Sequence, residues 1–352
     1  RPFLIKYCGQ AWSESVLIPE NPDYCVKCIL NTNFPSVRLD NDGVCNYCRR
    51  NDFLETVPAE PDPAAPETSP EGYHVILAYS GGKDSSYTLA MLRQEYNLRV
   101  LAITVDNGYL SEDALTNVKR VCTSLDVDSL VIAPSQDLLN RTFRYANDRA
   151  HLPMRSLERA SAICTYCIGL VKMLVYREAI LRRIPWIAFG WTPGQTPSRQ
   201  QLVKLDSSQV DRNFSLTRRA LDGELGDDAA RIVLGSGLLE EASENMPSLF
   251  YPFPGHDYDE AEIIGRIEDL GWVRPADTDA NSSNCVLNAF GIQEHVQKLG
   301  FHPYALELAT LVRNGNLPRE EALARVNEPV DNAAVESVRQ RLYGSVAEGS
   351  AR

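Results

Sequence analysis

The chain of 352 residues lacks three features that would place it in other classes of protein. No apolar run reaches the roughly 18 to 20 residues that a membrane-spanning helix needs. The segment Arg1–Tyr7 shows no apolar stretch with a small-residue cleavage site, as a secretory signal would. Lys and Arg number 35 against 47 Asp and Glu, a net charge of −12, so no broad basic face for nucleic acid is indicated. We therefore expect a cytoplasmic protein without a membrane or nucleic-acid partner.

Cysteine, in contrast, is plentiful, with nine residues of this type. In a reducing compartment cysteines serve more often as metal ligands or reactive thiols than as disulfides. Four of them form two C-x-x-C pairs, Cys25 with Cys28 and Cys45 with Cys48, with sixteen residues between the pairs. Each pair can offer two thiolates from one tight turn, and a hairpin turn is indicated at 41–43. The spacing predicts a closed structural zinc site, and two disulfides are the alternative that a reducing compartment disfavours.

Composition divides the chain into segments. Residues 58–70 are rich in proline and acidic residues and lack apolar periodicity, which is typical of an extended linker. We therefore expect a cysteine ribbon before the linker and a larger domain after it, followed by a helical region and a tail that frays unless 333–342 continues as a helix. The expected boundaries are 1–57 for the ribbon segment, 58–72 for the linker, 73–255 for the main domain, 256–330 for the helical region and 331–352 for the tail.

A phosphate-binding loop is predicted at the start of the main domain. The apolar run 74–79 is predicted to be a buried strand, a glycine-rich turn follows at once, and 87–96 has the pattern of a helix. A strand, a glycine-rich turn and a helix N-terminus together let backbone N–H groups and the helix dipole bind an anion. The Walker A order and the dinucleotide pattern G-x-G-x-x-G are both absent. The expected phosphate ligands are Ser80, Gly81, Gly82, Lys83, Asp84, Ser85 and Ser86.

This turn resembles the PP-loop, S-G-G-x-D-S, of the N-type ATP pyrophosphatase superfamily. The matching residues are Ser80, Gly81, Gly82, Asp84 and Ser85. The resemblance implies that the loop holds the pyrophosphate part of ATP with Mg²⁺ and that AMP is transferred to a substrate oxygen. Lys83 would then steady the charge on the pyrophosphate, and Asp84 would orient the loop or Mg²⁺. Asp106 and Gly190 end later strands, where ligands of α/β proteins collect, and complete the expected nucleotide site.

Strands and helices alternate through the main domain, which indicates an α/β fold with a doubly wound parallel sheet. The PP-loop resemblance implies its adenine nucleotide alpha hydrolase-like form. The pattern is weak between 200 and 254, and beyond 256 the chain is predicted to form a C-terminal helical appendage. The predicted strands are 74–79, 100–105, 128–133 and 186–190, and the predicted helices are 87–96, 114–125, 138–150, 170–184, 259–270, 289–299, 303–313 and 318–326.

A second group of cysteines follows the loop. Cys164 and Cys167 form another C-x-x-C pair in front of a predicted helix, and Cys285 ends a polar segment, 281–285, suited to the rim of an active site. Three interpretations are open at this point. The pair could form a redox-active disulfide at a helix N-terminus, the cysteines could be unrelated core residues like Cys122, or all three could hold a [4Fe-4S] cluster with one iron open to an exogenous ligand.

The order of ribbon, PP-loop, C-x-x-C pair and distant cysteine resembles that of cluster-dependent sulfurtransferases related to tRNA 2-thiolation enzymes. That resemblance implies that Cys164, Cys167 and Cys285 ligate the cluster and that sulfide on its open iron attacks an adenylated carbon. The tRNA enzymes carry a G-H-x-x-D-D signature after the strand that corresponds to 186–190. This chain has G-W-T-P-G-Q at 190–195 instead, which, with the acidic net charge, argues against a tRNA substrate.

A second resemblance concerns the ribbon. Phe34-Pro35 and the segment 42–48, together with S-G-G-K-D-S-S at 80–86, resemble the N-acetyl sugar amidotransferases of surface-polysaccharide synthesis. That resemblance implies amidation of an activated sugar carbonyl or amide by ammonia. The ammonia would come from a partner glutaminase, because no glutaminase unit is recognisable in this sequence.

Together these observations predict an ATP-dependent transferase that forms AMP and pyrophosphate. The hypothesis is that it adenylates a carbonyl or carboxyl oxygen of a small molecule and replaces that oxygen with sulfur from a [4Fe-4S] cluster. Amidation by ammonia, tRNA thiolation and a non-catalytic nucleotide-binding scaffold are the alternatives. The expected cofactors are ATP, Mg²⁺, Zn²⁺ and the cluster, and the expected partners are a sulfur or ammonia donor protein and a second copy in a homodimer. The expected catalytic residues are Lys83, Asp84, Cys164, Cys167 and Cys285.

Overall fold

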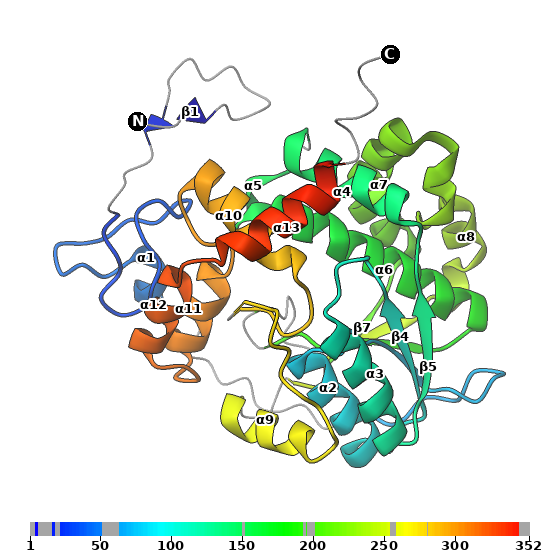
Figure 1. Cartoon of the computed structure of the whole chain (residues 1–352). Coiled ribbons are helices and arrows are strands. Elements are labelled where there is room, and N and C mark those ends of the chain that lie inside the picture. Colours follow the sequence, from blue (N-terminus) through cyan, green and yellow to red (C-terminus); the bar gives the residue numbers. More distant parts are fainter. Residues whose placement is uncertain are drawn as a thin grey trace.

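A mostly parallel sheet of six strands forms the centre of the computed structural model (Figure 1). Its order is β5-β4-β3-β6-β8-β7, and only β7 runs antiparallel to its neighbour. The order reverses between β3 and β6, which confirms the doubly wound arrangement and places a topological switch point between these two strands. The strands are β3 (Val75–Ala78), β4 (Val100–Val105), β5 (Asp128–Ile132), β6 (Trp186–Phe189), β7 (Leu202–Lys204) and β8 (Ser248–Phe250).

The structure describes residues 22–50, 63–149, 152–192, 195, 201–253, 258–279 and 281–344, with the side chain of Leu216 excepted. It also describes the backbone of a short antiparallel pair, β1 (Leu4–Ile5) and β2 (Val16–Leu17). Cys8, the first five residues of the expected linker (58–62) and the chain beyond 344 lie outside this part. No helix within it has the length and apolar character needed to cross a membrane.

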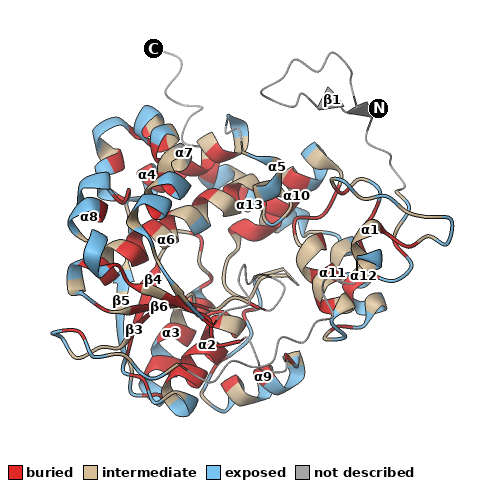
Figure 2. Cartoon of the chain, turned by 180° about the vertical axis from the view of Figure 1, so that it is seen from behind, coloured by how far each residue is buried: buried red, intermediate tan, exposed pale blue. Residues whose placement is uncertain are grey.

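Two hydrophobic cores cover the two faces of the sheet. Side chains alternate across β3, so that Ile76 enters one core while Val75 and Leu77 enter the other. Figure 2 shows the buried strands between these helical layers. The first core is made with α4 (Gln136–Asp148), α6 (Ala162–Arg182), α7 (Ser207–Leu225), α10 (Leu287–Leu299) and α13 (Asn332–Tyr343), and the second with α2 (Lys83–Ala90), α3 (Glu112–Ser124), α9 (Glu260–Glu268), α11 (Ala305–Arg313) and α12 (Arg319–Asn327).

Several elements depart from the sequence-based expectations. The helix after the PP-loop begins at Lys83 and continues from Met91 as a π-helix, η1 (Met91–Glu95). The helix expected from 170 begins at Ala162, so the Cys164–Cys167 pair lies inside its first turns and not in front of it. Ser161 caps this helix by accepting a hydrogen bond from the backbone N–H of Cys164. This cap lets the helix begin before the apolar stretch from which its start was predicted.

The C-terminal region is more ordered than its composition suggests. The tail was expected to fray unless 333–342 formed a helix; α13 occupies this stretch, and Val335, Val338 and Leu342 are buried in the first core. The weakly patterned stretch from 201 to 253 contains strands β7 and β8 as well as α7 and α8 (Ser236–Glu241). The short elements that complete the described chain are α1 (Asn46–Arg49), α5 (Met154–Leu157), η2 (Gly226–Arg231) and η3 (Ser243–Asn245).

The cysteine ribbon packs against the C-terminal helices α11 and α12, as Figure 1 shows. The Arg319 guanidinium at the start of α12 donates hydrogen bonds to the backbone carbonyls of Cys25 and Cys28, at 2.9 Å for each closest contact. Phe34 of the ribbon packs edge-on against Phe301, with ring centroids 5.0 Å apart. The ribbon is therefore part of the second core and not a separate module.

Candidate functional site

The ribbon cysteines form a compact group of four sulfur atoms, all within 4.8 Å of one another. The Sγ atoms of Cys25 and Cys48 are 3.8 Å apart, and those of Cys28 and Cys45 are 3.7 Å apart. Zn–S bonds of about 2.3 Å in a tetrahedron give sulfur–sulfur distances of about 3.8 Å. The four thiols therefore fit a single tetrahedral ion, and they leave no coordination position for a substrate.

The local fold directs backbone N–H groups at these sulfurs. The N–H of Cys45 donates to the sulfur of Cys25 at 3.2 Å, and the N–H of Cys48 donates to that of Cys45 at 3.4 Å. The predicted turn is present, because Gly43 has a φ of +74° and Leu39 bridges Cys45 across it. Before the turn, the pairing of the described residues is limited to this bridge. Such N–H donors orient the ligands of a closed metal site.

The PP-loop lies at the switch point of the sheet, between the carboxyl ends of β3 and β6. Two glycines allow the close packing. Gly81 has a φ of +73°, and a Cβ on it would lie 2.1 Å from the carbonyl oxygen of Ala114. A Cβ on Gly190, just after β6, would lie 2.5 Å from the Cα of Ser85. Any side chain at either glycine would displace the loop, so these positions hold its backbone against the sheet.

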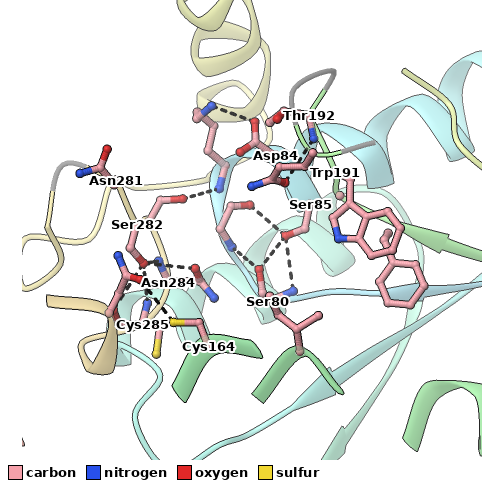
Figure 3. Close-up of a pocket in the computed structure, with 18 of the residues that line it drawn as sticks. Ser80, Asp84, Ser85, Cys164, Trp191, Thr192, Asn281, Ser282, Asn284 and Cys285 are labelled. Carbon is pink, nitrogen blue, oxygen red and sulfur yellow. Dashed lines mark hydrogen bonds and ion pairs between the residues drawn. The ribbon is translucent and has the colours of Figure 1, made fainter. Parts of the chain in front are cut away.

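Hydroxyl groups hold the loop from within. Ser80 Oγ lies 3.1 Å from Ser85 Oγ, and the Ser85 hydroxyl donates to the carbonyl of Gly82 at 3.0 Å (Figure 3). The backbone N–H of Lys83 donates to Ser283 Oγ at 2.9 Å, which ties the start of α2 to the polar segment 281–285. The loop is thus preorganised by both its own serines and a distant segment.

The Lys83 ammonium is held by acidic and phenolic groups. It donates to Asp84 Oδ1 at 2.8 Å and to the hydroxyl of Tyr258 at 2.7 Å, and it lies 3.7 Å from Glu260. The Tyr258 hydroxyl in turn donates to Asp84 at 2.9 Å. The side chain of Arg325 joins this network through an ion pair with Glu260 at 2.7 Å. A polyanion entering the cavity would compete with these carboxylates for the lysine.

The three later cysteines surround the same cavity from different elements. Cys164 and Cys167 lie one turn apart on α6, and Cys285 forms an antiparallel β-bridge with Leu110. The side-chain amide of Asn107 donates to the sulfurs of both Cys167 and Cys285, at 3.4 and 3.5 Å. Among the described residues, only the ribbon cysteines bring three or more metal-binding atoms within 4.8 Å of one another. The wider spacing suits a cluster, in which each sulfur binds a different iron, better than a single ion.

Burial controls the acidity of these three thiols. It raises the pKa of Cys164 and of Cys167 to about 12 and also raises the pKa of Cys285. A redox-active pair needs a lowered pKa, and here burial outweighs the N-terminus of α6. Half-buried thiols that line a cavity next to the PP-loop fit ligation by iron, because a metal cation would supply the missing positive charge.

The cavity has a volume of about 340 Å³ and brings together nine of the twelve predicted site residues outside the ribbon. The polar segment 281–285 forms part of its rim, as expected, and contributes Asn281, Ser282, Ser283 and Asn284 (Figure 3). The predicted residues that line it are Ser80, Gly82, Lys83, Asp84, Ser85, Cys164, Cys167, Gly190 and Cys285.

Three predicted residues contact the cavity only indirectly. Gly81 faces the protein, where its carbonyl accepts a hydrogen bond from Trp272 Nε1 at 2.9 Å. The Ser86 hydroxyl pairs with that of Tyr79 at 3.0 Å inside the second core. Asp106 accepts a hydrogen bond from the N–H of Gly108 at 2.8 Å, while its neighbour Asn107 lines the cavity. Their nucleotide contacts stay predictions.

Other cavity residues carry no motif and were missed. Tyr304 and Glu307 come from α11, Arg325 comes from α12, and Arg274 comes from the segment before the polar rim. Only Asn107 had a local signal, because it follows a predicted strand next to Asp106. Arg274 and Arg325 add positive charge to the side of the cavity on which Lys83 lies. A phosphate group or an anionic acceptor would bind on this side.

Comparisons with known proteins agree with this geometry. Residues 74–154 match the family model of the arginosuccinate synthase N-terminal HUP domain. An uncharacterized protein of Methanocaldococcus jannaschii is 26% identical over 270 residues, which cover 76% of this chain and 78% of that protein. The argininosuccinate synthase of Ehrlichia ruminantium strain Gardel is 32% identical over 77 residues, which cover 22% of this chain and only 19% of that enzyme.

A solved structure was also similar over most of the chain. It is the U34-tRNA thiolase NcsA from Methanococcus maripaludis with its [4Fe-4S] cluster, at 14% sequence identity and a TM-score of 0.35, covering 91% of this chain and 88% of that one. The assignment of the nucleotide site therefore depends on the matched HUP domain and the loop itself. The matched range, residues 74–154, contains the loop at 80–86.

Proposed function

We propose that this chain, a member of the PP-loop superfamily, is an ATP-dependent sulfurtransferase acting on a small molecule. In this proposal it adenylates a carbonyl or carboxyl oxygen of the acceptor, releases pyrophosphate, and replaces the oxygen with sulfur. One observation carries the proposal: the thiols of Cys164, Cys167 and Cys285 line one cavity with five residues of the PP-loop, which are Ser80, Gly82, Lys83, Asp84 and Ser85. A phosphate loop and a set of thiols in one cavity would bring an activated substrate next to sulfur chemistry.

The residues of the loop have distinct tasks in this reaction. Backbone N–H groups and the serine hydroxyls of 80–86 bind the phosphates of Mg-ATP at the N-terminus of α2. Lys83 leaves Asp84 and Tyr258 to neutralise the pyrophosphate as it departs. Adenylation converts a poor leaving oxygen into AMP, which leaves readily.

The three thiols would hold a [4Fe-4S] cluster, whose chemistry when bound is to present sulfur at the iron without a protein ligand. Asn107 holds Cys167 and Cys285 in place through its amide, and Asn288 accepts a hydrogen bond from Cys164 at 3.6 Å. The ribbon cysteines would hold zinc and fix α12 through Arg319. Zinc there has a structural role, because the four thiols close its coordination sphere.

The acceptor is proposed to be a small molecule on grounds of charge. The net charge of −12 provides no extended basic face, and the free positive charge in the cavity comes from separate side chains such as Arg274. Nucleic acid binding depends on many phosphate contacts made at once. A donor protein for sulfur and a homodimeric state are further parts of the proposal, which the sequence alone suggests.

Anaerobic purification followed by an activity assay tests this function. Iron, labile sulfide and zinc are counted per chain, with about four iron atoms and one zinc atom expected. AMP and pyrophosphate are then measured with Mg-ATP, sulfide or ammonium chloride, and either the small-molecule fraction of a cell extract or total tRNA. Product with sulfide and the small-molecule fraction supports the proposal.

Other outcomes of this assay identify the alternatives. If the protein holds zinc without iron, and if Cys285→Ala is fully active with ammonium chloride, the reaction is amidation and not sulfur transfer. If product forms only with tRNA, the acceptor is tRNA and not a small molecule. Binding of Mg-ATP with no AMP from any mixture would identify a nucleotide-binding scaffold.

A further inference from the structure

Glu307 is a half-buried acidic residue that has no assigned task in the nucleotide site or in either cysteine group. It lies on α11 and lines the cavity shared by the PP-loop and the three cysteines. Its carboxylate oxygens accept hydrogen bonds from Thr192 Oγ1 at 3.0 Å and from Gln195 Nε2 at 2.8 Å. The segment 190–195 after β6 has no acidic residue of its own. Helix α11 therefore supplies a carboxylate to this segment at the switch point.

The surroundings of Glu307 do not resemble those of a structural carboxylate. Both hydrogen-bond donors are neutral, and no ion pair joins Glu307 to a lysine or arginine of the described residues. Burying an anion without a cation is unfavourable, and a glutamine could serve the same two neighbours. A carboxylate that remains at a cavity wall despite this unfavourable free energy is a candidate for a functional role.

The charged and titratable groups that face Glu307 come from three elements. Asp84 and Lys83 approach from α2, Tyr258 from the segment before α9, and Tyr304 from the start of α11. The pKa of Glu307 is raised to about 7, mainly by burial and also by the charge of Asp84, against the lowering effect of the hydrogen bonds from Gln195 and Thr192 and of the charge of Lys83. A group with this pKa exchanges its proton readily at neutral pH.

The proposed reaction releases one proton. When hydrosulfide forms its bond to the adenylated carbon, AMP leaves with the electron pair of the carbon–oxygen bond, and the S–H proton must pass to a base. Ammonia would release one N–H proton in the same way. We infer that Glu307 is the proton acceptor of this step, an inference that rests on the proposed function. Its carboxylate becomes a carboxylic acid and returns the proton to water after AMP departs.

A pH profile of product formation tests this role. In the assay described above, the wild-type rate should rise with pH through about 7, because only the carboxylate accepts the proton. Glu307→Gln should lower kcat by about 10²-fold at the plateau and abolish the rise, with KM for ATP unchanged. Glu307→Asp should restore part of the rate together with the pH-dependent limb.

Two further variants separate chemistry from folding. Thr192→Val removes a donor that lowers the pKa of Glu307, so the limb should move to higher pH, a shift that a purely structural role would not produce. Glu262→Gln, on the exposed side of α9, should behave like wild type. A Glu307→Gln protein that keeps both rate and limb overturns this role while leaving the proposed function intact. Absence of AMP from the wild-type protein overturns the proposed function and this role with it.

Discussion

The two cysteine groups differ in how the chain assembles them. In the ribbon, four sulfurs converge within 4.8 Å through two local turns, and backbone N–H groups of the same turns point at them. Around the cavity, three thiols come from α6 and from a segment more than a hundred residues later, and a side chain, Asn107, bridges two of them. The first group is closed, and the second opens on a cavity that also contains the PP-loop.

The comparison shows what each arrangement is suited to do. A closed group that holds an ion would stabilise the structure around it, because losing the ion would leave three buried thiols and the half-buried Cys48 without a ligand and would loosen α12. An open group whose members lie on separate elements adds little to stability but places reactive atoms beside a substrate. A change in the closed group should therefore lower stability, whereas a change in the open group should lower activity with little effect on stability.

The largest effect is expected from Cys45→Ser compared with Cys285→Ser. Cys45→Ser should remove zinc and lower the thermal unfolding midpoint by about 10 °C or more, because structural zinc contributes directly to folding. Cys285→Ser should change the midpoint by about 2 °C or less while abolishing product formation. Calorimetry and metal analysis of both proteins check this. Equal loss of stability in both would remove the distinction between the groups.

The next test concerns the phosphate loop. A Cβ at Gly190 would lie 2.5 Å from the Cα of Ser85, so Gly190→Ala should displace the loop and weaken Mg-ATP binding by about 10²-fold. Gly237→Ala is the matched control, because nothing lies within 4 Å of a Cβ there and α8 should gain slightly in stability. Isothermal titration with Mg-ATP measures both. Unchanged affinity in Gly190→Ala would show that ATP does not depend on this loop geometry.

A smaller effect is expected where the ribbon meets α12. Arg319→Gln removes the hydrogen bonds to the carbonyls of Cys25 and Cys28 and should lower the free energy of unfolding by about 1–3 kcal/mol, with zinc retained. Arg49→Gln removes an exposed ion pair with Asp40 and a hydrogen bond to the carbonyl of Val44 inside the ribbon, and it should lower the free energy of unfolding by less than Arg319→Gln does. Urea unfolding checks both values. Loss of zinc from Arg319→Gln would mean that the helix, and not the ribbon turns, assembles the site.

Sequence alone predicts the local parts of this molecule well. The ribbon, the PP-loop and the parallel strands β3, β4, β5 and β6 follow from short motifs and apolar runs, because the forces that form them act over a few residues. Strand β8 was missed, because Ser248–Phe250 is too short to show a pattern. The start of α6 was misplaced because its cap at Ser161 looks like an ordinary loop serine.

The far side of the cavity could not be predicted in this way. Glu307 and Arg325 lie on amphipathic helices whose sequence indicates only which face is buried. Their place in the cavity results from packing of α11 and α12 against the ribbon and the sheet, through contacts such as Phe34 with Phe301. Chain segments nearly three hundred residues apart meet there, and no local spacing encodes such a meeting.

The last prediction concerns acid, which should weaken the ribbon side before the cavity side. His295 is buried with its ring edge-on to Phe301, 4.8 Å between centroids, and Phe301 in turn contacts Phe34 of the ribbon. Burial lowers the pKa of His295 to about 3, below the ordinary value of about 6.5 that holds in the unfolded chain. Below pH 6.5 the unfolded state therefore binds a proton that the folded state does not bind. Stability should fall as pH falls from 6.5 toward 3, and the share that His295 contributes to this loss should be about 2 kcal/mol at pH 5.

His295→Phe removes this dependence while preserving the aromatic contact. Urea unfolding at pH 7 and pH 5 should show a loss for the wild-type protein that is larger by about 2 kcal/mol than the loss for the variant. His302 is also buried, with its pKa lowered to about 4, so His295→Phe should retain part of the acid sensitivity. Identical losses in both proteins would show that His295 takes up its proton without disturbing the fold. The acid sensitivity would then have to arise elsewhere, and the ribbon would be no more vulnerable to it than the cavity.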